Sequence, residues 1–231
     1  MSIAHWLLIS LIPVSATVIG CLVAARYQPG PLISSAIQHF AAGVVFAAAA
    51  GEVLPELKHG SSVWSIAIGG GIGIATMLTL EQVGKRVSGA AGVVALVALD
   101  LFIDGLVLGL GFAGSAKAGI LLTFALTLEV LFLGLSLSLK LRENNFKPTA
   151  IVAMVAAICI LLPLGTLSAG LATQLPTIIL SGFFAFALVS LLYLVTEELL
   201  VEAHESGDAP WVAAMFFVGF LLLLILDALI A

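Results

Sequence analysis

Eight apolar stretches, each long enough to cross a lipid bilayer, constrain this chain more than any other feature of its sequence. A membrane-spanning helix needs about 20 mostly apolar residues. Such stretches lie at residues 3–25, 36–56, 62–86, 90–113, 117–140, 149–172, 177–203 and 210–230. The chain is 62% hydrophobic and only 9% charged, which is far from the balance of soluble domains. We therefore predict an all-α integral membrane protein with eight transmembrane helices, forming one domain over residues 1–231 in contact with the lipid bilayer.

The basic residues predict how the chain is oriented. Cytoplasmic loops close to helix ends retain Lys and Arg. Only Lys58 and Lys117 fall on one side of the predicted membrane, and the other side holds Arg26, Lys85, Arg86, Lys140, Arg142 and Lys147. Both termini should therefore lie outside the cytoplasm, in a multi-pass protein of the cell (plasma or inner) membrane. The net charge is −5, and we expect no nucleic-acid partner.

The first three predicted helices have a weak sequence match in the last three. A shift of 146 residues pairs Phe40 with Phe186, Glu52 with Glu198, Glu56 with Glu202 and Glu81 with Asp227, and a shift of 150 pairs Pro13 with Pro163 and Gly20 with Gly170. Five helices separate each pair, so the two copies cross the membrane in opposite senses. This pattern predicts a 3+2+3 arrangement, with inverted repeats at 3–86 and 149–230 around central helices at 90–140, as in many secondary transporters.

Three acidic residues lie near the middle of the predicted central helices. Asp100 and Asp104 are four positions apart, which places them on one face of a helix. Glu129 is twelve residues into the next helix. At 1.5 Å per residue, all three lie roughly 15 Å inside a core about 30 Å thick. We therefore expect the three carboxyl groups to face one another in the middle of the membrane.

A charge at that depth costs about 2.5–3.5 kcal/mol on insertion scales, so something must neutralise these groups. No Lys or Arg lies at a similar depth, which leaves protons or a bound cation. One interpretation is a metal site with Asp100, Asp104 and Glu129 as ligands. The other is three neutral acids that hydrogen-bond between helices.

The remaining acids could form a pathway through the membrane. Glu52, Glu56 and Asp227 fall near the predicted outer ends of helices, and Glu81, Glu197, Glu198, Glu202 and His204 fall near the inner ends. Together with the central acids they would offer an ion successive sites from one side to the other. The alternative is that they are solvated residues at helix ends.

Two segments carry recognisable motifs, "HFAAGVVFAAAAGEVLPEL" at 39–57 and "LLYLVTEELLVEAH" at 191–204. Both resemble the ZIP (zinc–iron permease, Zrt-Irt-like) family of divalent metal transporters. The resemblance covers nearly the whole chain and implies the 3+2+3 fold, metal transport and a possible homodimer. The fourth helix of the family usually carries His-Asn-x-Pro-Glu-Gly, and here Asp100 and Asp104 stand at the places of its metal-binding His and Glu. Glu129 matches the first ligand of the family's fifth helix.

The departures from the family pattern imply a single ion. Leu101, Leu133 and Leu162 replace residues that help to form a second metal site in family members with two metals. A site made only of carboxylates suits harder ions such as Mn²⁺ and Fe²⁺, whereas the resemblance favours Zn²⁺. We leave the substrate as a divalent transition metal of the Zn, Fe, Mn or Cd class.

The leading functional hypothesis is a secondary transporter that moves these ions toward the cytoplasm as one bundle rocks against the fourth and fifth helices. Two alternatives are the same fold carrying protons or an organic cation, and a metal-sensing membrane protein that does not transport. We do not expect an enzyme. An intramembrane protease would need HExxH or two aspartates on different helices, and both central aspartates here share one helix.

Overall fold

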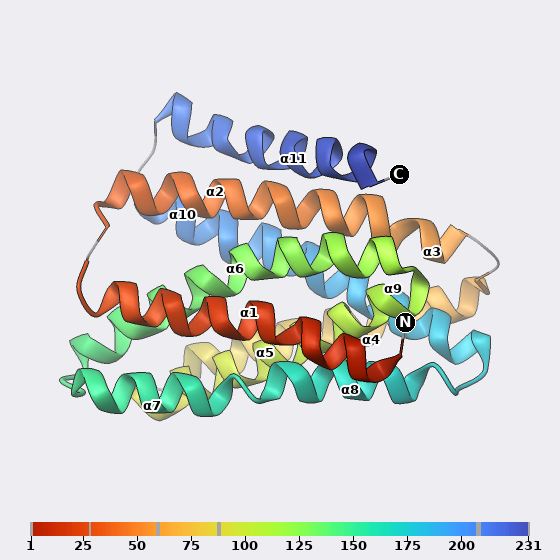
Figure 1. Cartoon of the computed structure of the whole chain (residues 1–231), viewed down its shortest axis with the longest axis horizontal. Coiled ribbons are helices and arrows are strands. Elements are labelled where there is room, and N and C mark those ends of the chain that lie inside the picture. Colours follow the sequence, from red (N-terminus) through yellow and green to blue (C-terminus); the bar gives the residue numbers. More distant parts are fainter. Residues whose placement is uncertain (1, 28, 59–60, 87–88, 207–208, 231) are drawn as a thin grey trace.

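The computed structural model describes residues 2–27, 29–58, 61–86, 89–206 and 209–230. Nearly all of these residues are helical, and the described ranges contain no strand. Eight segments are long and apolar enough to cross a membrane, as the sequence predicts. They run side by side along the long axis of the molecule (Figure 1).

We number the segments spans 1 to 8 in chain order, and three of them consist of more than one helical element. The elements are α1 (Ile3–Ala24) in span 1; α2 (Pro31–Ala48), η1 (Ala49–Val53) and α3 (Leu54–Lys58) in span 2; α4 (Val63–Arg86) in span 3; α5 (Ala90–Gly114) in span 4; α6 (Ala116–Glu143) in span 5; α7 (Pro148–Ile158) and α8 (Leu161–Ala172) in span 6; α9 (Thr177–Tyr193), η2 (Leu194–Leu199) and α10 (Leu200–Ser206) in span 7; and α11 (Pro210–Ile230) in span 8.

The two termini lie at the same end of the bundle, as an even number of spans requires (Figure 1). We call the opposite end the basic end. It holds the connections between spans 1 and 2, 3 and 4, 5 and 6, and 7 and 8, and therefore Arg26, Lys85, Arg86, Lys140, Arg142 and Lys147.

The spans pack as two groups of four. Spans 1, 4, 5 and 6 form the first group through contacts of α1 with α6, α5 with α8 and α5 with α6. Spans 2, 3, 7 and 8 form the second through contacts of α2 with α11, α4 with α9 and α2 with α10. Exchanging spans 1–3 with 6–8, and span 4 with span 5, leaves these contacts unchanged. The packing is therefore that of an inverted repeat in which the two central helices replace each other.

Close helix crossings at glycine show the register of the repeat. A Cβ added at Gly219 would clash with the carbonyl oxygen of Phe40, and a Cβ added at Gly73 would lie 3.3 Å from the carbonyl oxygen of Phe186. Gly73 and Gly219 are 146 residues apart, and so are Phe40 and Phe186. The 146-residue shift read from the sequence therefore describes spans 2, 3, 7 and 8.

Spans 1 and 6 are the first helices of the two repeats. Their packing relates them by a different shift from the 150 residues matched in the sequence. Gly20 packs on the backbone of Leu131 in span 5, and Gly165 packs on the backbone of Phe102 in span 4. These crossings make Gly165 the structural equivalent of Gly20, a shift of 145. The 150-residue match of Gly20 with Gly170 does not correspond to the packing, because Gly170 faces Ile3 instead.

Two short π-helical segments interrupt equivalent spans. Segment η1 contains Glu52, and segment η2 contains Glu197 and Glu198. A π-helical turn inserts an extra residue into the hydrogen-bonding pattern, and such turns are frequent at functional sites. Here both coincide with acidic residues of the repeated motif.

Candidate metal site

A very short turn at Ser115 places the three central acids at one depth. Ser115 follows α5 directly and is also the N-cap of α6, with its Oγ accepting a hydrogen bond of 2.9 Å from the Ala118 N–H. Such caps satisfy an N–H that the helix itself leaves unpaired. The chain therefore reverses at once, and α5 and α6 pack antiparallel. Asp100 lies fifteen residues before Ser115 and Glu129 fourteen after it, so the two acids meet at similar depth.

The structure brings together the three residues predicted as ligands. Asp100, Asp104 and Glu129 each offer one carboxylate oxygen, and these oxygens all lie within 4.8 Å of one another. Asp104 and Glu129 are each only 2% exposed, and Asp100 is half-buried. Carboxylate oxygens that converge in this way can contact one hard divalent cation together.

The two buried acids have unused hydrogen-bonding capacity. Oδ2 of Asp104 and Oε2 of Glu129 are buried and have no hydrogen-bond partner among the described residues. None of the ion pairs formed within the described ranges involves these acids. Buried carboxyl oxygens without partners are costly. The mutual hydrogen bonds of the interhelical alternative are therefore not formed by these two oxygens.

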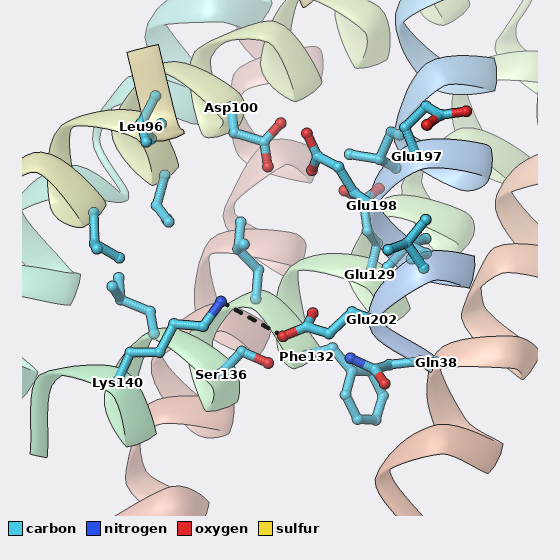
Figure 2. Close-up of a pocket in the computed structure, with 18 of the residues that line it drawn as sticks. Gln38, Leu96, Asp100, Glu129, Phe132, Ser136, Lys140, Glu197, Glu198 and Glu202 are labelled. Carbon is cyan, nitrogen blue, oxygen red and sulfur yellow. Dashed lines mark ion pairs between the residues drawn. The ribbon is translucent and has the colours of Figure 1, made fainter. Parts of the chain in front are cut away.

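A cavity of about 530 Å³ reaches the site from the basic end. Asp100 and Glu129 line its inner part, and Lys140, Glu202 and Glu205 line it toward the basic end. Lys140 forms an ion pair with Glu202 across 3.5 Å (Figure 2). In this conformation the cavity leads from the basic end to Asp100 and Glu129 through an opening lined by acidic residues, whereas Asp104 lies behind them and does not line it.

A fourth carboxylate faces the site from the other group of spans. Glu198 lies in η2 of span 7, and its carboxylate points toward Asp100 across the cavity (Figure 2). The neighbouring Glu197 carboxylate points away from Asp100 (Figure 2). From their positions in the sequence, both were predicted only as pathway residues. The structure shows that Glu198 faces Asp100 from the second group of spans (Figure 2).

The other residues predicted for the inner pathway divide into two sets. Glu81, Glu197 and Glu202 line the cavity. Glu81 also accepts a hydrogen bond from the Tyr193 hydroxyl and forms an ion pair with Lys85. His204 packs its ring against that of His39 instead.

The residues predicted for the outer pathway lie together at the end that carries the termini. Asp227 forms an ion pair of 2.6 Å with Lys117, and Glu52 lies close enough to interact with its carboxylate. Glu56 lies against Gly114, where an added Cβ would be 2.8 Å from its Oε1. Lys117 thus provides a positive charge for this outer acidic cluster.

Two polar residues near the cavity were not predicted as site residues. Ser190 lines a small void beside Asp100 and Asp104, and its Oγ is buried without a hydrogen-bond partner among the described residues. Gln38 lines the large cavity, and its Oε1 is equally unpaired. Ser190 stands alone in an apolar stretch, and Gln38 is followed by His39 in a stretch that is otherwise apolar from residue 36 to residue 51. The polarity of these positions was the available signal, although it does not show which way a side chain faces.

The fold and the site define a multi-pass membrane protein with a buried carboxylate cluster that could hold a metal ion. Comparison of the chain with protein-family models and with curated proteins gives no match. The resemblance to the ZIP family therefore depends on the motifs within the sequence.

Proposed function

We propose that this chain transports divalent transition-metal ions across the membrane, with Asp100, Asp104 and Glu129 as ligands of a single mid-membrane site. The observation that supports this most strongly is the convergence of the three carboxylates, two of which, Asp100 and Glu129, line the inner part of a cavity. Polar groups inside membrane proteins commonly mark the path of an ion or proton.

The arrangement favours a metal ion over a proton as the cargo. A proton needs one acid at a time, whereas a divalent cation requires several oxygens directed at one point. Three ligand oxygens from two helices meet this requirement. Oxygen ligands favour Mn²⁺ and Fe²⁺, and Zn²⁺ and Cd²⁺ remain within the proposed substrate class.

We further propose that the chain is a divergent member of the ZIP family. Support comes from the exchange symmetry of the helix contacts around two central helices and from Asp100, Asp104 and Glu129 at the family's ligand positions. Leu101, Leu133 and Leu162 stand where ligands of a second metal would be, and leucine cannot coordinate an ion. A single central ion follows.

The two groups of spans provide a physical basis for alternating access. All three proposed ligands belong to spans 4 and 5 of the first group, whereas Glu198 belongs to the second group. Spans 4 and 5 pack tightly with spans 1 and 6, so the moving unit is this group of four rather than a bundle rocking against the central pair. Ions would leave through the cavity toward the basic end, which is cytoplasmic by its Lys and Arg content.

Uptake into proteoliposomes tests this function. The purified chain is reconstituted around a metal-sensitive dye, and Mn²⁺, Fe²⁺, Zn²⁺ and Cd²⁺ are added outside. Wild-type vesicles should show saturable uptake that Asp104→Asn and Glu129→Gln each abolish. Glu143→Gln, which changes an exposed acid at the end of α6, should leave uptake unchanged. Uptake that persists in both central variants would refute the assigned ligands.

A further inference from the structure

A pair of histidines lies beside the cavity, close to the basic end. His39 in α2 and His204 in α10 have ring centroids 4.9 Å apart, with their planes at 64°. Their sequence neighbours Gln38 and Glu205 line the cavity. The pair is thus next to the route that joins the central acids to the basic end.

Each ring makes the same hydrogen bond to its own helix. Nδ1 of His39 lies 2.9 Å from the carbonyl oxygen of Ser35, and Nδ1 of His204 lies 2.6 Å from the carbonyl oxygen of Leu200. A carbonyl oxygen can only accept, so Nδ1 carries the proton in both rings. The lone pair is then on Nε2 of each ring. This is the arrangement of metal-binding histidines, whose second nitrogen usually donates to a carbonyl or carboxylate.

The Nε2 atom of His39 makes no hydrogen bond within the described residues. His39 is only 4% exposed, and its Nε2 is buried without a hydrogen-bond partner. The ring of His204 is next to it and is open to solvent. A buried nitrogen lone pair without a donor is unfavourable, and a metal ion between the two rings would satisfy it.

The separation of the rings fits one bound ion. Two imidazoles on a tetrahedral Zn²⁺ or Co²⁺, with metal–nitrogen distances of about 2.0–2.1 Å, have ring centres about 5 Å apart. The observed 4.9 Å matches this spacing. The helices are also held together nearby, because the Ser35 hydroxyl donates a 2.7 Å hydrogen bond to the carbonyl oxygen of Ala203.

We propose that Nε2 of His39 and Nε2 of His204 form a second metal site, selective for ions that accept nitrogen ligands, such as Zn²⁺ and Co²⁺. Both residues belong to the group of spans 2, 3, 7 and 8. An ion bound here would therefore join spans 2 and 7 without blocking a movement between the two groups. The site goes beyond the proposed transport function, because it differs from the central site in ligands and location.

Cobalt titration of the full-length chain in detergent tests this site. The central site is first removed with Asp100→Asn, Asp104→Asn and Glu129→Gln together. Calorimetry should then show one Co²⁺ per chain, with the visible absorption of nitrogen-coordinated Co²⁺. Adding His204→Gln, a change of an exposed residue, should abolish both signals, and so should His39→Gln. His5→Gln, which changes an exposed histidine at the other end of the bundle, should retain both.

Two results would overturn the proposal. One is that the chain without its central acids binds no Co²⁺. The other is that it binds equally well after His204→Gln. Neither result bears on the proposed central site, because that site is tested by uptake in the chain that retains its three acids. Conversely, a failure of uptake would not alter the cobalt titration.

Discussion

Asp100 and Glu129 stand at matching positions on the two central helices. Each lies five residues before the glycine, Gly105 or Gly134, at which its helix meets a neighbouring backbone. Gly105 packs on Leu162 of α8, and Gly134 packs on Thr17 of α1. Thr17 and Leu162 are themselves 145 residues apart, which is the shift that relates Gly20 to Gly165.

This equivalence places the candidate site on the symmetry axis of the fold. An inverted repeat has an approximate two-fold axis in the membrane plane, and residues that meet their own equivalents lie on it. Asp100 and Glu129 are such a pair. The depth of the site therefore follows from the symmetry of the packing, and it lies equally far from both ends of the bundle.

The same symmetry predicts the effect of adding an acid at Leu133. Asp104 lies four residues after Asp100, and Leu133 lies four residues after Glu129, so Leu133 is the equivalent of Asp104. Leu133 also lines the cavity, one turn beyond Glu129. Leu133→Asp should complete a second set of carboxylates and raise the number of Mn²⁺ ions bound per chain from one to two. Without metal it should lower stability by about 2.5–3.5 kcal/mol, the insertion cost of a central acid. Calorimetric titration and thermal unfolding in detergent measure the two effects.

Ser136→Asp provides the matched control for this prediction. Ser136 lines the same cavity but is not equivalent to an acid in span 4, where the matching residue is Val107. The control should leave the stoichiometry at one. If both variants bind equally, the symmetry argument for position 133 is wrong.

Much of this fold could be predicted from the sequence, because apolar length and turn residues act locally. The eight predicted stretches coincide with the spans, although span 2 begins at Pro31 rather than residue 36. Proline suits the first helical position because its missing N–H needs no partner there. Within span 6, the helix breaks at Cys159 and Ile160, before Pro163. The proline ring clashes with the carbonyl of the residue four positions earlier, which is Cys159.

The parts of the site that could not be predicted depend on how each helix is rotated. Hydrophobic helices show little contrast between faces, so a sequence gives the depth of a polar residue but not its direction. The depth of the three central acids was therefore predictable. The approach of Glu198 from span 7 depends on the π-helical segment η2. The contact of His39 with His204 depends on tertiary packing in the same way.

A second prediction concerns the glycine crossing of spans 1 and 5. A Cβ at Gly134 would overlap the carbonyl oxygen of Thr17, and backbone cannot move aside as a flexible side chain can. Gly134→Ala should therefore lower stability by about 1–3 kcal/mol, the usual cost of overpacking. Gly71→Ala, where an added Cβ meets nothing within 4 Å, should be neutral or stabilise by up to about 1 kcal/mol through helix propensity. Thermal unfolding in detergent compares the two, and equal effects would contradict the crossing.

A third prediction separates the stability of the protein from metal binding at Asp104. Asp104 is buried, and its carboxylate oxygen lies within 4.8 Å of those of Asp100 and Glu129. Asp104→Asn keeps the shape of the side chain but removes one of these like charges, so it should raise the stability of the metal-free protein by about 1–3 kcal/mol. In wild type, Mn²⁺ at a hundred times its Kd should add about 2.7 kcal/mol, and this gain should disappear in the variant. A variant that is destabilised without metal would indicate that Asp104 holds the helices together instead.

The last prediction assigns Glu198 a role in ion transfer between the two groups of spans. Glu198 faces Asp100 from span 7 (Figure 2), so its charge attracts a cation that leaves the central ligands. Two unit charges a few ångströms apart interact by a few kcal/mol at an effective dielectric constant of about 20. Glu198→Gln should therefore slow Mn²⁺ uptake at least about tenfold while calorimetry still shows one central ion. Glu197→Gln changes the adjacent carboxylate that points away (Figure 2), and its uptake should stay within about twofold of wild type. Equal loss in both variants would mean that the net negative charge of the cavity matters, rather than the position of Glu198 opposite Asp100.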